Sequence, residues 1–537
     1  KIGKNTTLKM DKSTPQSHDS RFLTNATQDV LLYCQHNKGT AFTKEERRQH
    51  RLRGLLPHRI ETIQQQAERA LYQFNSKSTP LEKYVFLQSL RNRNETLFYY
   101  LLTQNIEKML PIVYTPTVGA ACVNFDSIWR ETQGMYLTLE DKGQIREILN
   151  NWKQTPDIIV MTDGSRILGL GDLGANGMGI AIGKCSLYVA GAGFHPIKTL
   201  PICVDVGTNN SKIRDDRFYL GMRQPRVRGE QFFTFMDEVM SAIKSKWPKT
   251  LVQFEDWSND VCFELLERHR NKSLCFNDDI QGTGAVIVSG FINAVKLSEI
   301  SLKDHSVVFV GAGSAAVGVA DQMSKIFAEG TDLSPQQIRE RFYLIDSQGL
   351  VTNNRGDWER IKQVGAFKVP YARSDIPSDS PLQTSDLLTI VKGLKPTVLI
   401  GLSGQFSGGF TKEVIEQHAK NHKNPIIFAL SNPTDKSECT AEEAIKYSNG
   451  TAIFACGSPF PPVEFNGKTY ISGQGNNMYI FPGLGFGSYL SGSSVVTEDM
   501  ILAAAKSLAD YVSEDEMRKT RNIYPSLTKI REISLNV

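Results

Sequence analysis

Two acidic pairs, each at the end of an apolar run, are the residues of this sequence best placed to do chemistry. Glu255 and Asp256 follow the strand-like run 251–254, and Asp278 and Asp279 follow a second such run. In an α/β sheet, residues just past the carboxyl ends of the strands line the ligand crevice. Carboxylates that converge there repel one another unless a cation lies between them, and oxygen ligands favour Mg²⁺ or Mn²⁺ over zinc. We therefore expect a divalent metal site; the alternative is a pair of ordinary loops with solvated acids.

A glycine-rich segment after the apolar run 306–310 has the pattern of a dinucleotide-binding turn. A helical pattern follows it, and a strand before with a helix after is the context that such a fingerprint requires. The pyrophosphate would lie at the helix N-terminus, and Asp346, at the end of the next strand, would bind the adenosine ribose hydroxyls. We therefore expect a Rossmann-type domain. Its cofactor-binding residues would be Gly311, Ala312, Gly313, Ser314, Ala315, Ala316 and Asp346.

The elements that position these residues predict an α/β fold in three parts. Strand-like runs alternate with helical patterns over most of the chain, whereas its first part is mainly helical. We expect a helical N-terminal domain, a second α/β domain that carries the metal and the substrate, and a Rossmann-type dinucleotide-binding domain. The expected boundaries are 1–130 for the first, 131–279 joined by 476–537 for the second, and 280–475 for the third. Residues 1–28 are polar and predict a loosely ordered arm.

Two further segments are expected to form functional loops. Residues 111–119 contain two prolines and a glycine, which predict a rigid loop that holds Tyr114 in place; a tyrosine that merely packs is the alternative. Residues 169–184 are dense in glycine and end in Lys184, so their backbone N–H groups could cradle a carboxylate or phosphate. Because Cys185 follows Lys184, the segment lacks the ending of a P-loop, and an ATP site is not expected.

The composition is that of a globular protein, and it argues against several function classes. The 537 residues are 40% hydrophobic and 22% charged, and the net charge of +4 is too balanced to indicate nucleic-acid binding. The 8 cysteines include no closely spaced pair, which indicates reduced thiols. The longest nearly uncharged apolar run, 284–295, is too short to span a bilayer. His418 and His422 stand on a predicted helix, where a surface helix is favoured over a metal-binding pair.

Six segments, taken in order, resemble the malic enzymes of the large animal type. The resemblance extends over nearly the whole chain from about Asn37 and is expected to be strongest to the mitochondrial, NAD-dependent members. It implies oxidation of L-malate by NAD⁺ or NADP⁺ with a divalent metal, followed by decarboxylation to pyruvate and CO₂. The segments are 114–119, 169–184, 254–256, 276–283, 429–434 and 473–477.

The resemblance implies a role for each acidic residue and for the lysine. Glu255, Asp256 and Asp279 match the family's metal ligands, and Asp278 would lie beside Lys184. The metal would bind the malate hydroxyl and a carboxylate oxygen, which lowers the pKa of the hydroxyl. Lys184 matches the general base that takes the hydroxyl proton. A lysine is a base near neutral pH only if its pKa is depressed, and burial beside a dication would depress it.

Other residues match the family's acid and its substrate-binding groups. Tyr114 matches the acid that protonates the enolate left by decarboxylation. Arg166 matches the bidentate clamp on a substrate carboxylate, a task that suits its planar fork. Asn432, together with Asn476 or Asn477, would hydrogen-bond the same ligand.

The sequence favours NAD⁺ over NADP⁺ as the cofactor. Asp346 would bind the ribose hydroxyl and repel a 2′-phosphate. Ser347 resembles the NADP-using members, but the lysine that those members carry further on is replaced by Gln363, with Lys362 beside it. We therefore expect NAD⁺, with NADP⁺ as the alternative.

The resemblance also implies an effector, an assembly and a location. Glu61, Arg69 and Arg93 match a fumarate-binding site at a dimer interface in some members; ion pairs within a helical domain are the alternative. A homotetramer built as a dimer of dimers is implied. The Lys-rich start of the chain fits a mature mitochondrial matrix protein, and a cytoplasmic enzyme is the alternative.

Two other functions stay open on the sequence alone. A metal-dependent hydroxyacid dehydrogenase that stops at the ketoacid would not need Tyr114 on a rigid loop. A non-catalytic, dinucleotide-sensing protein on this fold would be expected to have lost a metal ligand or the base, and none of these residues is lost here.

Overall fold

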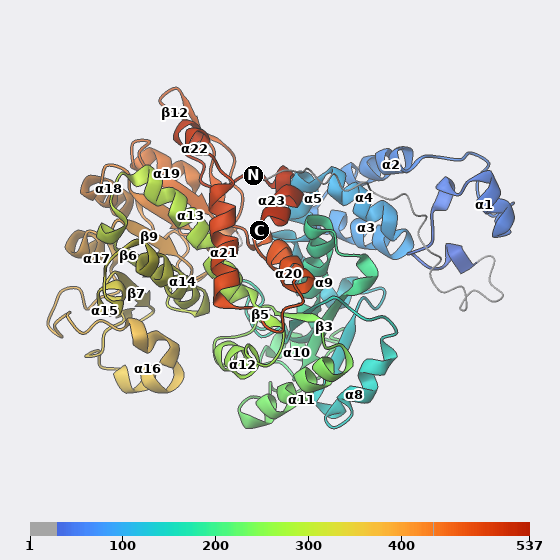
Figure 1. Ribbon diagram of the computed structural model, residues 1–537, viewed down its shortest axis with the longest axis horizontal. Helices are drawn as coiled ribbons and strands as arrows, with labels where there is room; N and C mark the ends of the chain where they lie inside the picture. Colours follow the sequence, from blue (N-terminus) through green and yellow to red (C-terminus); the bar gives the residue numbers. More distant parts are fainter. Residues whose placement is uncertain (1–28, 433) are drawn as a thin grey trace, which may run out of the picture. The chain divides into compact units, whose positions relative to one another are not determined.

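The computed structural model describes residues 29–432 and 434–537, which form two compact units (Figure 1). The first unit contains residues up to 78 together with 86–104, and the second contains 79–85 and 105–537. The expected N-terminal arm, 1–28, and Pro433 lie outside the described residues.

The first unit is helical, as the sequence predicts for this region. Its helices are α1 (Lys44–Gln49), α2 (Ile63–Asn75), α4 (Glu95–Gln104) and much of α3 (Pro80–Arg93). The helices α1 and α2 each begin at a capping box, in which a threonine and the side chain three residues on accept hydrogen bonds from each other's backbone N–H groups.

The second unit contains a five-stranded parallel sheet. Its strands lie in the order β1-β3-β2-β4-β5, and every residue of β2 and β4 is buried, which is why the sequence marks both as apolar runs. Helices α11 and α12 share a core with this sheet, and α9 contacts β2 and β3. These elements are β1 (Met135–Thr138), β2 (Ile158–Thr162), β3 (Thr199–Asp205), β4 (Leu251–Phe254), β5 (Cys275–Asn277), α9 (Met178–Leu187), α11 (Glu230–Lys246) and α12 (Cys262–His269).

A seven-stranded sheet carries the glycine-rich turn. Its strands are β6 (Val307–Val310), β7 (Phe342–Asp346), β8 (Gly349–Leu350), β9 (Val398–Gly401), β10 (Ile426–Ala429), β11 (Ile453–Cys456) and β14 (Gly473–Gln474). They lie in the order β14-β11-β10-β9-β6-β7-β8, and only β8 is antiparallel to its neighbour. The chain order reverses between β6 and β9, and α14 (Ser314–Gly330) follows β6. The predicted Rossmann-type domain is therefore confirmed, and its ligand crevice lies at this switch point.

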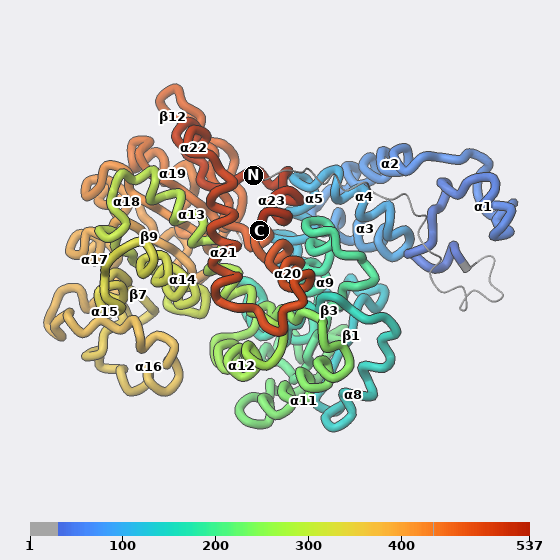
Figure 2. Tube along the Cα trace, viewed as in Figure 1, coloured from blue at the N-terminus to red at the C-terminus, as the bar shows by residue number. Residues whose placement is uncertain are grey.

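One helical run joins the two sheets. The π-helical turn η9 (Asp278–Gly282) begins directly after β5 and continues as α13 (Thr283–Ser298), which packs against α14 and α21 (Glu498–Asp510) (Figure 2). By length and composition the run 278–298 could cross a membrane, unlike the shorter apolar run within it, but most of it is buried as a core helix. A Cβ added at Gly318 of α14 would lie 2.3 Å from the Ile280 carbonyl oxygen, so α14 and η9 meet backbone to backbone.

Residues 111–119 are more helical than the sequence predicts. The helix α5 (Ile106–Val113) contains Pro111, and α6 (Thr117–Val123) begins after a short break. Buried apolar side chains on α5 hold this helix across its proline, which outweighs the loss of one backbone hydrogen bond. The expected rigid loop is therefore a break between two helices, and Tyr114 lies in that break.

The glycine-dense segment was expected to be a loop, and this prediction is wrong for its second half. That half forms η6 (Gly174–Gly177) and α9, so Lys184 stands on a buried helix. A Cβ added at Gly183 would lie 2.9 Å from the Val113 carbonyl oxygen. Glycine on α9 therefore serves close packing against α5 rather than an anion cradle.

The last part of the chain returns to the first sheet. Helix α20 (Phe481–Leu490) contacts β4, and α23 (Ile530–Asn536) packs against α20. The expected division at residues 130, 279 and 475 stays a prediction. Other helices and strands are α7 (Phe125–Ile128), α8 (Ile145–Ile148), α10 (Ser211–Arg214), α15 (Pro335–Arg339), α16 (Trp358–Val364), α17 (Leu387–Leu394), α18 (Lys412–Asn421), α19 (Ala441–Tyr447), α22 (Glu514–Thr520), β12 (Val463–Phe465) and β13 (Lys468–Tyr470).

Candidate active site

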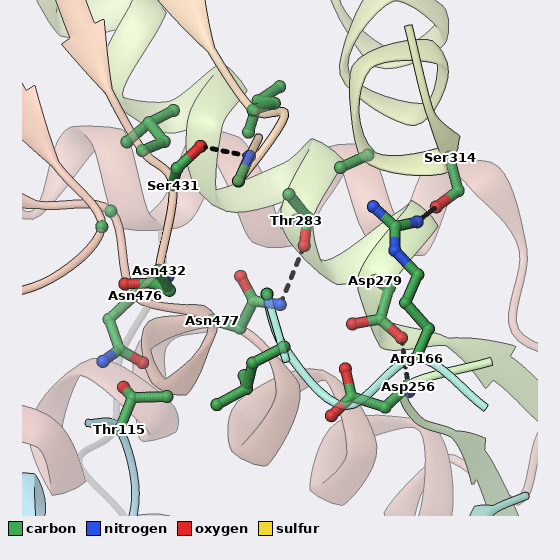
Figure 3. Close-up of a pocket in the computed structure, with 18 of the residues that line it drawn as sticks. Thr115, Arg166, Asp256, Asp279, Thr283, Ser314, Ser431, Asn432, Asn476 and Asn477 are labelled. Carbon is green, nitrogen blue, oxygen red and sulfur yellow. Dashed lines mark hydrogen bonds between the residues drawn. The ribbon is translucent and has the colours of Figure 1, made fainter. Parts of the chain in front are cut away.

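Three carboxylates converge where β4 and β5 end. Glu255 and Asp256 follow β4, and Asp279 lies in η9 directly after β5, which pairs with β4. One carboxylate oxygen from each residue lies within 4.8 Å of the other two. The Asp256 backbone N–H donates to Asp279 Oδ2 at 2.7 Å (Figure 3). The structure therefore brings together three of the four acids that the sequence singles out.

This cluster fits a divalent cation. Its donors are all carboxylate oxygens, the set that suits Mg²⁺ or Mn²⁺. Asp256 Oδ2 is buried and accepts no hydrogen bond in the described part of the chain. Burial raises the pKa of each of the three carboxyl groups, and the charges of neighbouring carboxylates raise it further. A cation among them would offset both effects.

Lys184 is fully buried on α9 and faces two carboxylates. Its Nζ lies 2.5 Å from Asp278 Oδ2 and 3.0 Å from Glu255 Oε1. Burial lowers the pKa of Lys184, but the charges of Asp278 and Glu255 raise it, and the net shift is upward. The sequence predicts the opposite direction, because it does not show that two ion pairs meet this lysine. A cation on Glu255 would compete with Lys184 for the same carboxylate, so cation binding favours loss of the lysine proton.

Tyr114 lies next to this lysine. Lys184 Nζ is 5.1 Å from the centroid of the Tyr114 ring and 4.3 Å from that of Phe481. Burial raises the pKa of Tyr114 well above its ordinary value, although the charge of Lys184 acts in the opposite direction. The phenol therefore keeps its proton and is able to act as a donor.

Glu255 is held in place by two residues, Gln253 and Tyr188, that no sequence motif indicates. Gln253 Nε2 donates to Glu255 Oε2 at 2.7 Å, and the Tyr188 O–H donates to Gln253 Oε1. All three side chains are buried. The available signal was a glutamine inside the otherwise apolar strand β4, since a buried amide needs partners.

Arg166 stands between the carboxylates and the dinucleotide-binding helix. Its Nη1 donates to Ser314 Oγ at 3.0 Å (Figure 3). The same Nη1 donates to Asn259 Oδ1 at 2.6 Å. Ser314 is the first residue of α14, and its backbone N–H also donates to Asn259 Oδ1. Sequence patterns single out Arg166 but not Asn259, which belongs to no motif.

The three asparagines expected at the substrate line one cavity but differ in their contacts. The Ser458 O–H donates to Asn432 Oδ1 at 2.5 Å. Asn477 Nδ2 donates to Asp278 Oδ2 at 2.9 Å, so this amide also positions the acid that pairs with the lysine. Asn476 is nearly buried and lines the same cavity.

Two adjoining cavities connect these groups, with volumes of about 160 Å³ and about 830 Å³. Arg166, Gly169 and Ser403 line both of them. The smaller, inner cavity is also lined by Tyr114, Glu255, Asp256, Asp279, Ser314, Ala315, Asn432, Asn476 and Asn477. The larger, outer cavity is also lined by Gly311, Ala312, Gly313 and Asp346, whereas Ala316 is buried within α14 and lines neither. The acid cluster and the glycine turn therefore open onto one continuous region.

Asp346 does not face the outer cavity as an isolated charge. Arg355 binds its two carboxylate oxygens at 2.8 and 3.0 Å, and Lys368 Nζ lies 3.0 Å from Oδ2. Burial raises the pKa of Asp346, but the hydrogen bonds from Arg355 and Lys368 outweigh it, and the net shift is downward. The repulsion of a 2′-phosphate that the sequence expects from Asp346 is thus compensated by two cations.

The other charged residues of this region divide between the cavity and the outer surface. Arg360 and Ser347 line the outer cavity, and Arg360 is exposed and forms no ion pair within the described residues. Lys362 pairs with Glu359 at 2.6 Å. Neither Lys362 nor Gln363 lines the two cavities, so the comparison of these two residues does not decide the cofactor.

The expected effector residues and the histidine pair are not among the residues that line the two cavities. Glu61 pairs with Arg69 in the first unit, and Arg93 is exposed at the end of α3. The fumarate site stays a prediction. His418 is buried rather than on a surface, and burial lowers its pKa to about 3. Its Nε2 lies 3.2 Å from the Ile426 carbonyl oxygen, as expected for a histidine with a structural role.

Family models match most of the chain. The model described as "Malic enzyme, N-terminal domain" matches residues 91–270, and the model described as "Malic enzyme, NAD binding domain" matches residues 280–537. The NADP-dependent malic enzyme of Dictyostelium discoideum is 54% identical over 502 residues, which cover 93% of this chain and 90% of that protein. A chloroplastic NADP-dependent malic enzyme of Flaveria pringlei is 48% identical over 504 residues, which cover 94% of this chain and 76% of that protein.

Solved structures of lower identity share the fold. The malic enzyme of Entamoeba histolytica has a TM-score of 0.55 at 21% identity, covering 90% of this chain and 84% of that one. The malic enzyme of Pyrococcus horikoshii has a TM-score of 0.51 at 22% identity, covering 80% of this chain and 82% of that one. At these identities the likeness concerns the fold alone.

Proposed function

This chain belongs to the malic enzyme family, and on that premise we propose that it oxidises L-malate and decarboxylates the product to pyruvate and CO₂. The electrons pass to NADP⁺, and Mg²⁺ or Mn²⁺ is required. The convergence of Glu255, Asp256 and Asp279 beside Lys184 and Tyr114 supports this most directly. The metal ligands and the acid then line one small cavity, and the base pairs with one of those ligands, Glu255.

Lys184 is the base of the oxidation step. Its neutral Nζ takes the proton of the malate C2 hydroxyl while the hydride leaves C2 for the nicotinamide ring, which gives oxaloacetate. Asp278, 2.5 Å away, stabilises the resulting ammonium group. Glu255, Asp256 and Asp279 would hold a divalent cation, which would supply Lewis acidity at the substrate oxygens. Arg166 and Asn432 hold the substrate carboxylates.

Tyr114 is the acid of the last step. Loss of CO₂ from the β-ketoacid leaves the enolate of pyruvate, whose C3 must receive a proton. Tyr114 carries that proton because burial raises its pKa, and Lys184 beside it returns the proton taken from the hydroxyl. The proton balance therefore closes between two neighbouring side chains.

Release of CO₂ tests the proposed function against its alternatives. One CO₂ is expected for each dinucleotide reduced with malate. A hydroxyacid dehydrogenase that stops at the ketoacid would reduce the dinucleotide without releasing CO₂ enzymatically, and a sensing protein would do neither.

Replacing Tyr114 with phenylalanine is expected to separate the two halves of the reaction. Decarboxylation of added oxaloacetate should stay near the wild-type rate, while pyruvate formation falls by roughly 10²-fold, because only protonation of C3 needs the phenol. The two rates are measured as CO₂ release and pyruvate appearance from oxaloacetate. Tyr72→Phe, on an exposed side chain of α2, is the matched control. Equal loss of both rates would contradict the role of Tyr114.

We propose NADP⁺ rather than NAD⁺ for three reasons. The relatives that are 54% and 48% identical are named NADP-dependent. In the structure, Arg355 and Lys368 compensate the charge of Asp346, which was the ground for expecting NAD⁺. Arg360 lines the outer cavity, and its guanidinium is available to a 2′-phosphate.

The substitution Arg360→Gln is expected to lower kcat/KM for NADP⁺ by about tenfold or more and to leave the value for NAD⁺ nearly unchanged, because only NADP⁺ carries the 2′-phosphate. Steady-state rates with each dinucleotide at saturating malate give both values. Lys362→Gln, two residues on and paired outward with Glu359, should change neither. A wild-type preference for NAD⁺ would overturn the cofactor proposal.

The assembly, the effector and the location stay predictions from the sequence. The homotetramer and the fumarate site at Glu61, Arg69 and Arg93 depend on the family resemblance. The mitochondrial location depends on the start of the chain, which lies outside the described residues.

A further inference from the structure

A fully buried glutamate lies directly behind the loops that line both cavities. Glu438 follows the turn η12 (Thr434–Lys436), and its side chain is 0% exposed. The Ser431 O–H donates to Glu438 Oε1, and the Ser431 backbone N–H donates to Oε2 at 3.3 Å. The Ser403 backbone N–H acts to lower the pKa of this carboxyl group. A Cβ added at Gly401, the last residue of β9, would lie 2.2 Å from Glu438 Cδ, so the same side chain packs against a second, separate segment.

These two segments leave the ends of adjacent strands, of which β9 borders the switch point and β10 is the next strand in the sheet. Ser403 belongs to the loop that follows β9, and Ser431 belongs to the loop that follows β10. The loops also bond to each other, since the Gly404 N–H donates to Ser431 Oγ at 2.9 Å (Figure 3). Ser403 lines both cavities, and Asn432, next to Ser431, lines the inner one. Glu438 is therefore the point at which the two loops are tied together.

The carboxylate has no cation to balance it. None of the described lysine, arginine or histidine side chains pairs with Glu438, and its hydrogen bonds come from hydroxyl and backbone N–H groups. Burial raises the pKa of Glu438 to about 7, although these hydrogen bonds act in the opposite direction. A buried carboxyl group without an ion pair costs stability, so its presence behind the site needs a reason other than packing.

We propose that Glu438 is a positioning residue that fixes the loops after β9 and β10. It thereby sets where the Asn432 amide meets the substrate and where the Ser403 backbone meets the dinucleotide. The inference rests on the proposed function for the role of Asn432. The substrate and the nicotinamide must approach each other closely for hydride transfer, and each contacts one of the two loops. A single tie between the loops keeps both ligands in register.

Glutamine is the substitution that isolates this role. The variant Glu438→Gln keeps the shape of the side chain but replaces one acceptor oxygen with an NH₂ group. The NH₂ group accepts no hydrogen bond, so the carboxamide keeps one acceptor oxygen where the carboxylate has two, and it carries no charge. The tie between the loops is therefore weakened, while the acid cluster and Lys184 remain untouched.

The experiment compares Glu438→Gln, Glu438→Asp and Glu442→Gln. The last variant changes an exposed glutamate of α19 that pairs with Lys446, so it is the matched control. The measurements are KM for malate, kcat, the affinity for NADP⁺ by isothermal titration in the absence of malate, and the thermal midpoint. For Glu438→Gln we expect KM and the dinucleotide Kd each to rise by about tenfold, with a smaller change in kcat. Glu438→Asp, which keeps the charge, should recover part of both, and Glu442→Gln should match the wild type.

Unchanged KM and Kd in a folded Glu438→Gln protein would overturn the proposal, as would a loss of kcat alone. Where both Glu438 variants fail to fold, Ser431→Ala decides, because it removes the same tie without burying a new group. It should raise KM and Kd as Glu438→Gln does, and a wild-type result rejects the proposal. Dinucleotide affinity is measured without turnover, so absence of malate oxidation in the wild type would reject the proposed function and still leave the tie testable.

Discussion

Lys184→Arg lowers kcat for malate oxidation by about 10³-fold, the expected effect of removing a general base from a reaction that must take a hydroxyl proton. Arginine keeps the positive charge that faces Asp278 and Glu255 at 2.5 and 3.0 Å, but it does not lose a proton in a protein. Lys184→Ala is expected to lose as much activity. Reduction of added ketoacids should partly survive in both variants, because the metal and the dinucleotide still bind.

Comparing Lys184→Ala with Lys184→Arg separates the loss of the catalytic base from a loss of folding stability. Lys184→Ala leaves two buried carboxylates without their cation, so its thermal midpoint should fall, whereas Lys184→Arg retains the ion pairs. Rates are measured on protein shown to be folded by its thermal transition, with Lys423→Ala, on an exposed side chain, as control. Full malate turnover by a folded Lys184→Arg protein would reject the assignment of the base.

The second large effect is expected from the acid cluster. Asp279→Asn should weaken binding of Mn²⁺ by at least about 10²-fold, because the substitution removes one of three charged ligands and leaves an amide among buried carboxylates. Binding is followed by the paramagnetic signal of free Mn²⁺, which does not depend on turnover. Activity should fall in parallel and return in part at high Mn²⁺ concentration.

Acidity should weaken the same binding. Burial and mutual repulsion raise the pKa of Glu255, Asp256 and Asp279 in the protein without a cation. Protons therefore compete with the metal at a higher pH than for exposed carboxyl groups, and the affinity for Mn²⁺ falls as the pH falls. Asp260→Asn, a change to an exposed neighbouring acid, is the control and should not alter Mn²⁺ binding. An unchanged Mn²⁺ affinity in Asp279→Asn would show that the cluster does not hold the metal.

The sequence predicts the parts of this fold that depend on local pattern. The buried parallel strand β6 is apolar along its whole length, and β4 is apolar except for Gln253. The glycine turn after β6 follows a known rule. The acid cluster was predictable for the same reason, since its residues follow the ends of neighbouring strands. Residues that directly follow a predicted strand were therefore placed correctly together with that strand.

The parts that the sequence did not predict depend on contacts between distant residues. Arg355 and Lys368 compensate the negative charge of Asp346, which removes the ground for expecting NAD⁺. Nothing in the spacing of these three residues indicates that they are in contact. The glycines of α9 resemble those of an anion-binding loop, because the sequence does not distinguish a glycine that permits close packing from one that binds a phosphate. Glu438 likewise has no local signal, since its partners follow two other strands.

The backbone contact between α14 and η9 fixes a distance within the candidate active site. Gly318 rests on the carbonyl of Ile280, in the turn that carries Asp279, with no side chain between them. The distance between the helix that follows the glycine turn and the turn that carries Asp279 is therefore set by backbone atoms rather than by the sizes of side chains. Changes of the surrounding side chains can leave this distance unchanged, whereas a methyl group at Gly318 would push α14 and η9 apart.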